Sequence, residues 1–220
     1  RGALPWAAAA GLVLGALGLA AGWALWHPRP MTEAPVVLRY AMALPDSLAF
    51  EDGDGSSLAY APDGSVFTYG SRTGLQLRSA DRLDPVPVPG GRRGSGPFFS
   101  PDGQWLGFLT DGRLVKVPLA GGASVTIADS SVGYNFDWGA DDTIRYHTIL
   151  PTNQNSRVLM AISARGGRPR ILAQPDSASG ELFRSPTLLP DRRTVLFTIW
   201  KQSASRLAAL DLRTGAITRF

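Results

Sequence analysis

The sequence predicts an all-β fold built from four similar four-stranded units. Glycine and proline are abundant, with 25 and 17 among 220 residues, which suits short strands and tight turns better than long helices. One turn motif recurs, and Asp63, Asp102, Asp141 and Asp191 occupy its corresponding position at separations of 39, 39 and 50 residues. A period near 40 in a strand-rich chain is typical of the blades of a β-propeller.

The second unit shows the pattern most clearly. Its expected strands read PFFS, QWLGFL, RLVKVP and ASVTIA, and the turns between them read PDG, TDG and LAGG. In the first of these turns Pro101 presets φ, Asp102 can accept hydrogen bonds from nearby backbone amides, and Gly103 tolerates a positive φ. RLVKVP alternates apolar and other residues, as a strand with one buried face does.

The other three units follow the same order less regularly. The strands expected in the first, third and fourth units are SLAY, VFTYG, LQLR and VPVP; YNFDW, TIRYH, RVLMAI and RPRIL; and SPTLL, TVLFTI, RLAAL and AITRF. A longer loop through Ser156 is expected in the third unit. The strand VVLRYAMAL, residues 36–44, precedes the first unit and is a candidate to complete a final blade. Stacked blades share a core, so a structural role is predicted for Pro62, Asp63, Gly64, Pro101, Asp102, Gly103, Asp141, Pro190 and Asp191.

The first part of the chain predicts a membrane anchor. Leu4–Trp26 is 23 residues without a charge, and as a helix it would be about 34 Å long, enough to cross a hydrocarbon core. Trp6 lies near one end, with Trp23 and Trp26 near the other, where tryptophan favours the headgroup level. The predicted organisation is a transmembrane helix within residues 1–27, a Pro-bearing linker at 28–35 and propeller blades over 36–220. A secretory signal peptide is the alternative.

Four glycines could bring two such helices together. Gly11, Gly15, Gly18 and Gly22 are spaced by 4, 3 and 4 residues, so they share one helix face and would allow a homodimer through the membrane segment. The competing interpretation is that a glycine- and alanine-rich sequence simply fills an undemanding apolar segment.

Charge and composition exclude several function classes. The net charge is +4 and there is no run of five like charges, so no nucleic-acid tail is expected. Without cysteine there is no disulfide or thiolate site, and with only His27 and His147 no metal or other cofactor is expected. EDGDGSS, residues 51–57, lacks the later glutamate of an EF-hand and is interpreted as a polar loop, with calcium as the alternative. RRGSGP, residues 92–97, could bind an anion through backbone amides, but it is no phosphate loop because it neither follows a strand directly nor opens a helix.

The repeat resembles a known family. FSPDGQWLGFLTDGRLVKVPLAGGASVTIAD, residues 99–129, is similar to the PD-type propeller repeats of TolB-like proteins, and above all to those of bacterial transmembrane serine/threonine protein kinases. In such kinases a catalytic domain precedes one membrane helix, a Pro-bearing linker and a propeller outside the cytoplasm. The order of segments from Leu4 to Phe220 has this layout. The family continues with more blades, so the four units are expected to be part of a larger propeller.

The resemblance implies a role in signalling. The chain is expected to be the extracytoplasmic sensor or protein-interaction propeller of a protein anchored by one span in the inner membrane. It carries no Gly-rich loop with its lysine, no HRD and no DFG, so it is not expected to be an enzyme, and a kinase domain would precede Arg1. Two alternatives are a TolB-like envelope scaffold without a kinase and the non-catalytic propeller of an anchored serine peptidase, although no GxSxG elbow is present.

The binding face is predicted from the irregular loops. The stretches Ile149–Arg157, Gln174–Ser185 and Trp200–Arg206 are the longest, and each joins the second to the third strand of a unit or one unit to the next. They should therefore share one face, where a protein or small molecule would bind. The candidate residues there are Asn153, Gln154, Asn155, Arg184, Trp200 and Lys201. The alternative interpretation is that these loops are tolerated insertions.

Overall fold

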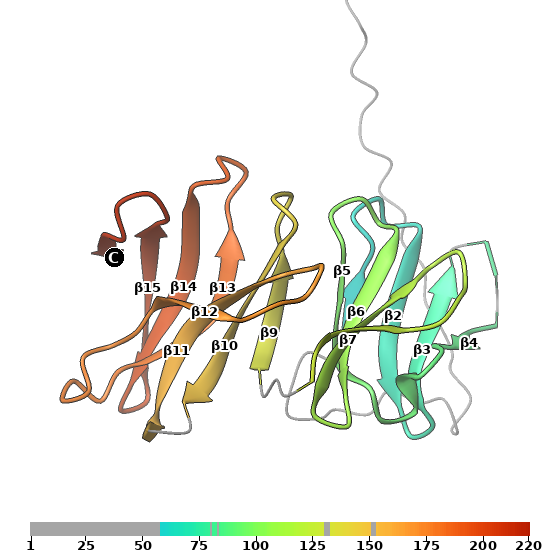
Figure 1. The fold of residues 1–220 in the computed structure, drawn as a ribbon, viewed down its shortest axis with the longest axis horizontal. Helices are drawn as coiled ribbons and strands as arrows, with labels where there is room; N and C mark the ends of the chain where they lie inside the picture. Colours follow the sequence, from blue (N-terminus) through green and yellow to red (C-terminus); the bar gives the residue numbers. More distant parts are fainter. Residues whose placement is uncertain (1–57, 80, 83, 130–132, 151–152) are drawn as a thin grey trace, which may run out of the picture. The chain divides into compact units, whose positions relative to one another are not determined.

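The computed structural model describes residues 58–79, 81–82, 84–129, 133–150 and 153–220 (Figure 1). The predicted membrane helix with its glycine stripe, the linker, the strand at 36–44 and the polar loop at 51–57 lie outside these residues. Within the described part of the chain, no helix has the length and apolar character needed to cross a membrane.

The described residues form four four-stranded antiparallel sheets, which confirms the all-β prediction and the four units. In each sheet the strands lie side by side in chain order, as in a propeller blade. Blade 1 consists of β1 Leu58–Tyr60, β2 Val66–Ser71, β3 Gly74–Ser79 and β4 Val86–Pro87; blade 2 of β5 Ser95–Phe99, β6 Trp105–Thr110, β7 Arg113–Pro118 and β8 Val125–Ala128; blade 3 of β9 Gly133–Trp138, β10 Thr143–Leu150, β11 Asn153–Ser163 and β12 Arg170–Ala173; and blade 4 of β13 Leu182–Leu188, β14 Thr194–Lys201, β15 Ala204–Asp211 and β16 Ile217–Arg219. A short 3₁₀ turn, η2 Gly91–Arg93, precedes β5.

The repeated motif forms the turn between the first and second strand of every blade. The aspartate side chain accepts a hydrogen bond from the backbone N–H two residues later, at 3.0 Å for Asp63 and Asp102, 3.3 Å for Asp141 and 2.9 Å for Asp191. The next residue is left-handed in all four turns: φ is 72° at Gly64, 66° at Gly103, 57° at Asp142 and 57° at Arg192. The turn geometry is therefore constant, although only two of the four units place glycine there.

All three irregular loops are shorter than the sequence predicts. The connection after β12 ends at Glu181, so Arg184 and Ser185 belong to β13. β10 extends to Leu150 and β11 begins at Asn153, so the expected loop through Ser156 is mostly paired strand. β14 and β15 are joined by Gln202 and Ser203 alone, both with positive φ (47° and 71°), as in a tight hairpin. These strands continue through polar residues because they pair with each other. The polar ends have no hydrophobic alternation from which a strand could be predicted.

Three apolar clusters join each blade to the next. Residues of blades 1 and 2 share one cluster around Leu75 and Phe108, and those of blades 2 and 3 share another around Phe98 and Ile144. Blades 3 and 4 meet around Leu159 and Phe183. The first strands of successive blades also contact one another: β1 contacts β5, β5 contacts β9, and β9 contacts β13. Each blade thus buries an apolar face by stacking on its neighbour, which explains why one turn design is repeated.

Candidate functional site

The first strands of blades 2, 3 and 4 carry the same local distortion. Their pairing registers shift within β5, β9 and β13, as at β-bulges. A residue with positive φ lies in each of these strands: Gly96 (57°), Asn135 (52°) and Ser185 (51°). Each stands six residues before the turn aspartate of its blade. The bulges therefore repeat with the blades and change the direction of the backbone where the first strands adjoin.

A pocket of about 570 Å³ lies among these first strands. The walls come from β1, β5, β9 and β13, so four segments distant in sequence contribute to one site. Its lining includes Leu58, Tyr60, Gly96, Pro97, Phe99, Asn135, Phe136, Asp137, Ser185, Pro186 and Thr187. This volume is within the range of sites that hold a small ligand or a short segment of a protein.

Polar contacts hold the blade 3 and blade 4 walls together. The Asn135 Nδ2 donates a hydrogen bond to Ser185 Oγ at 2.6 Å, so the two bulge residues bind each other. The Leu188 backbone N–H donates to Asp137 Oδ2 at 2.9 Å. Burial raises the pKa of Asp137, although this hydrogen bond and the charge of Arg145 act in the opposite direction. These contacts fix the width of the pocket on this side.

Aromatic and aliphatic side chains supply the rest of the surface. Tyr60 and Leu58 are 55% and 41% exposed, so both side chains are accessible to a partner. The Phe136 ring stacks on the buried Phe98 ring, with centroids 4.9 Å apart. Walls that combine aromatic side chains with fixed polar groups are suited to binding a ligand. Among the described residues, no group of three or more His, Cys, Asp or Glu side chains could hold a metal.

The buried side chain of His147 contacts the bulge of blade 4, which forms one wall of this pocket. It is buried, it stacks on Tyr134 at 5.6 Å, and its Nδ1 accepts a 3.4 Å hydrogen bond from the Ser185 backbone N–H. Burial lowers the pKa of His147 to about 4, and the charges of Arg157 and Arg184 act in the same direction. His147 is therefore neutral at pH 7 and accepts this bond from the bulge of blade 4.

The face predicted from the loops is a separate surface. Arg184 lies over the Trp200 ring, with its Cζ 4.8 Å from the centroid, and Lys201 lines a pocket of about 370 Å³ together with Glu181 and Arg206. Asn153, Gln154 and Asn155 begin β11, and their side chains are outside the described part of the structure. Since successive strands of a blade alternate in direction, the β10–β11 turn, the β12–β13 connection and the β14–β15 turn emerge at the same end.

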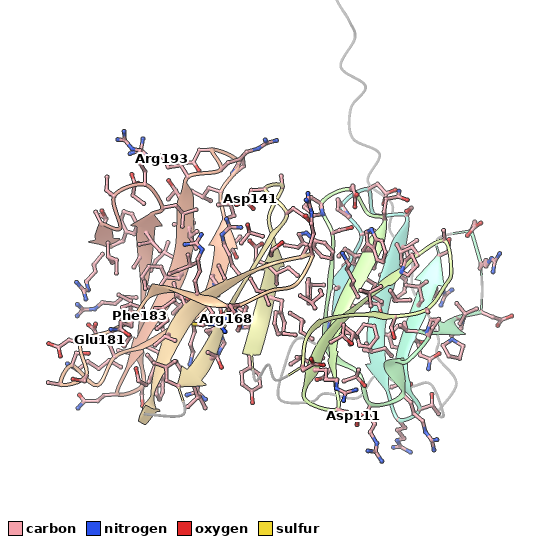
Figure 2. All side chains as sticks on the ribbon, in the orientation of Figure 1. Asp111, Asp141, Arg168, Glu181, Phe183 and Arg193 are labelled. Atoms are coloured by element: carbon pink, nitrogen blue, oxygen red, sulfur yellow. The ribbon has the colours of Figure 1, made fainter. Side chains whose placement is uncertain are left out.

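The predicted structural residues occupy the opposite end of the blades. Figure 2 shows Asp141 and Arg193 at one end, whereas Asp111, in the β6–β7 turn, lies at the other. Pro62, Pro101 and Pro190 each precede the aspartate of a first turn. Asp141 has an additional role, because it accepts two hydrogen bonds from the fully buried guanidinium of Arg145 at 3.1 and 2.5 Å. Burial would raise the pKa of Asp141, but Arg145 outweighs it and the net pKa is lowered.

The bulge residues are not among the residues predicted from the sequence, although their spacing marks them. Gly96, Asn135 and Ser185 share one distance from the turn aspartates, and glycine and asparagine tolerate left-handed backbone readily. The exposure of Tyr60 could not be predicted from the sequence, because a tyrosine in an apolar strand usually packs in the core.

The fold is that of a TolB-like β-propeller. The structure is similar to a TolB protein from Agrobacterium tumefaciens, with a TM-score of 0.61 and 19% identity over 74% of this chain and 60% of that one. It is also similar to TolB from Acinetobacter baumannii (TM-score 0.60, 17% identity, 74% and 42% covered) and to oligogalacturonate lyase from Vibrio parahaemolyticus (0.54, 15%, 74% and 51%). The chain thus spans less than two thirds of the length of these proteins. No protein-family model and no curated protein sequence matches it.

Proposed function

We propose that this chain is a protein-interaction propeller that binds an extended segment of a partner protein in the pocket among its first strands. The repeated bulges carry the proposal, because they give three blades the same irregular wall around one cavity of about 570 Å³. Exposed Tyr60 and Leu58 provide the apolar contacts, and the Asn135–Ser185 pair provides polar groups. Aromatic side chains in a partly open pocket are typical of binding energy concentrated in a few residues.

We further propose that the propeller is the extracytoplasmic sensor of a signalling protein with one span in the inner membrane. The uncharged segment Leu4–Trp26, the linker and the blades follow one another as in the bacterial serine/threonine kinases that the repeats resemble. The likeness to TolB structures supports an envelope scaffold without a kinase equally well. The coding sequence upstream of Arg1 distinguishes the two: a kinase domain is expected for the sensor and none for the scaffold.

The binding site can be tested by photo-crosslinking in the cells that naturally produce the chain. p-Benzoylphenylalanine replaces Tyr60, and in a matched control it replaces Val125, which is 47% exposed on the outer strand β8 of blade 2. We expect the probe at residue 60, and not the probe at residue 125, to crosslink one distinct protein that mass spectrometry identifies.

A second substitution links the crosslink to the pocket. Asn135→Gly permits the left-handed backbone but removes the side chain that bonds Ser185, so the pocket loses a polar group and the bond between two of its walls, and the crosslink at residue 60 should decrease. The same set of proteins at both probe positions, or an undiminished crosslink in a folded Asn135→Gly chain, would reject the pocket as the binding site.

A further inference from the structure

Three turns from blades 1 and 2 enclose a second cavity, of about 620 Å³, which shares no residue with the pocket among the first strands. The turns are the β2–β3 hairpin, the η2 segment with the preceding Gly90, and the β6–β7 hairpin. The lining consists of Arg72, Thr73, Gly90, Arg92, Arg93, Thr110 and Asp111. We call this cavity the arginine pocket. Figure 2 shows Asp111 at the end of the blades opposite Asp141.

Close backbone packing holds the arginine pocket in shape. A Cβ on Gly74 would lie 2.5 Å from the Gly91 carbonyl oxygen and 2.6 Å from the Arg92 Cα, so the β2–β3 hairpin presses directly on η2. A Cβ on Gly94 would likewise lie 2.6 Å from Leu75 Cδ1. The atoms that Gly74 meets are backbone atoms, so this position cannot carry a side chain without moving η2. The backbone that carries Arg72 and Arg92 is therefore fixed by its fold.

Hydrogen bonds inside the turns add to this rigidity. The Ser71 hydroxyl donates to the Gly74 carbonyl at 2.8 Å, and Gln76 Nε2 donates to Thr73 Oγ1 at 3.0 Å. The Thr110 hydroxyl donates to the Gly90 carbonyl at 3.4 Å, which ties the β6–β7 turn to the start of η2. A site whose backbone is already ordered loses less entropy when it binds a ligand.

The charge of the arginine pocket is strongly unbalanced. Three arginines and one carboxylate line it, and Asp111 lies 3.4 Å from Arg93, with both side chains largely exposed. Among the described residues, Arg72 and Arg92 pair with no carboxylate. Two positive charges therefore remain uncompensated around a cavity of small-ligand size.

We propose that the arginine pocket binds a ligand that carries a phosphate group. A guanidinium offers a planar fork of N–H donors that matches phosphate oxygens, often in bidentate pairs. A phosphate monoester carries about two negative charges and a diphosphate carries more, so either suits the two unpaired arginines better than a single carboxylate does. The phosphate belongs to a free metabolite or to a lipid headgroup, and the experiment distinguishes these sources.

The test uses the 220-residue chain and three variants. Arg72→Gln and Arg92→Gln remove the unpaired guanidiniums, while Arg213→Gln removes one exposed arginine from the β15–β16 turn, outside the pocket, with the same change in charge. Pyrophosphate and inorganic phosphate are titrated calorimetrically. Vesicles that contain phosphatidic acid, whose headgroup is a phosphate monoester, are compared with phosphatidylcholine vesicles by co-sedimentation.

The expected result is binding that depends on the pocket. Pyrophosphate should bind the native chain and lose at least about tenfold in affinity with either pocket variant, but less than about twofold with Arg213→Gln. Binding to phosphatidic acid vesicles with the same dependence would instead assign the phosphate to a lipid headgroup. Equal losses in all three variants, or no binding of either probe, would overturn the proposal. The crosslink at residue 60 should be unchanged in these variants, so the two proposals fail independently.

Discussion

At the scale of single residues, the first turn of each blade depends on one left-handed position. Gly64, Gly103, Asp142 and Arg192 all have φ between 57° and 72°. Glycine adopts this backbone at no steric cost, whereas a residue with a Cβ loses about 1 kcal/mol or more. Blades 1 and 2 avoid this strain and blades 3 and 4 retain it. Asp142 gains a compensating contact with Arg165 at 3.2 Å, but Arg192 has no ion pair among the described residues.

Substitutions at this position should therefore change stability in opposite directions. Gly103→Val should lower the free energy of unfolding by roughly 1–3 kcal/mol, because a β-branched residue is strained at this φ. Arg192→Gly should raise it by up to about 1 kcal/mol, because it relieves strain already present. Urea unfolding followed by circular dichroism measures both. A Cβ on Gly103 would lie no closer than 3.7 Å to any atom, so Gly103→Asn, which tolerates positive φ, is the control. A similar loss from Asn and Val would contradict the explanation.

At the scale of an element, the centre of blade 2 depends on a strand glycine that has no unusual backbone. Gly107 pairs with Phe98 across β5 and β6, and a Cβ there would lie 2.3 Å from the Phe98 Cζ. The Phe98 ring is buried in the cluster between blades 2 and 3, where it also stacks on Phe136. Gly107 thus leaves the space that the Phe98 ring occupies.

Gly107→Ala should lower the free energy of unfolding by about 2 kcal/mol, since overpacking a rigid core has this cost. Phe98→Leu should also destabilise, because it removes part of a buried ring. Combined, the two should cost less than the sum of the single changes, because the smaller side chain gives the methyl group room. A double-mutant cycle of urea denaturation measures the difference. Strict additivity would show that Gly107 and Phe98 do not limit each other.

At the scale of the whole described unit, the junctions between blades decide stability. Blades 3 and 4 share an apolar cluster and three polar contacts that cross the junction: Asn135 to Ser185, Asp137 to the Leu188 N–H, and His147 to the Ser185 N–H. Two of these contacts converge on the bulge at Ser185. The state of one buried histidine is therefore linked to the junction and to the wall of the pocket among the first strands.

The junction should weaken as the pH falls. The pKa of His147 is about 4 in the folded chain and about 6.5 when unfolded. Below pH 6.5 the unfolded chain takes up a proton that the folded chain resists, so stability is fully present above pH 6.5 and is lost as pH falls toward 4. Between pH 7.5 and 5.0 the loss is roughly 2 kcal/mol. Comparing urea unfolding of the native chain and His147→Phe at both values isolates this histidine. An identical pH dependence in the two proteins would contradict the prediction.

The sequence alone determined the repeat and the local chemistry of its turns. Proline, aspartate and glycine at a spacing of 39 residues encode one tight turn, because φ preferences and short-range side-chain hydrogen bonds act within a few residues. The alternation of apolar and other residues in RLVKVP likewise predicted the strand β7, because successive side chains of a strand point to opposite faces. The period of about 40 residues predicted one four-stranded blade for each repeated turn, and hence the all-β fold class.

Tertiary structure alone decided where these units create a site. The 570 Å³ pocket needs four first strands to adjoin, and its walls depend on bulges whose registers are set by pairing with β6, β10 and β14. The arginine pocket likewise brings Arg72 close to Arg92 through the contact of Gly74 in blade 1 with η2. Contacts between residues that are 20 to 50 positions apart depend on how blades stack, and stacking is a property of the packed core. Tertiary structure also made β10 and β11 longer than their apolar residues predict. Pairing with a neighbouring strand stabilises polar residues in a sheet.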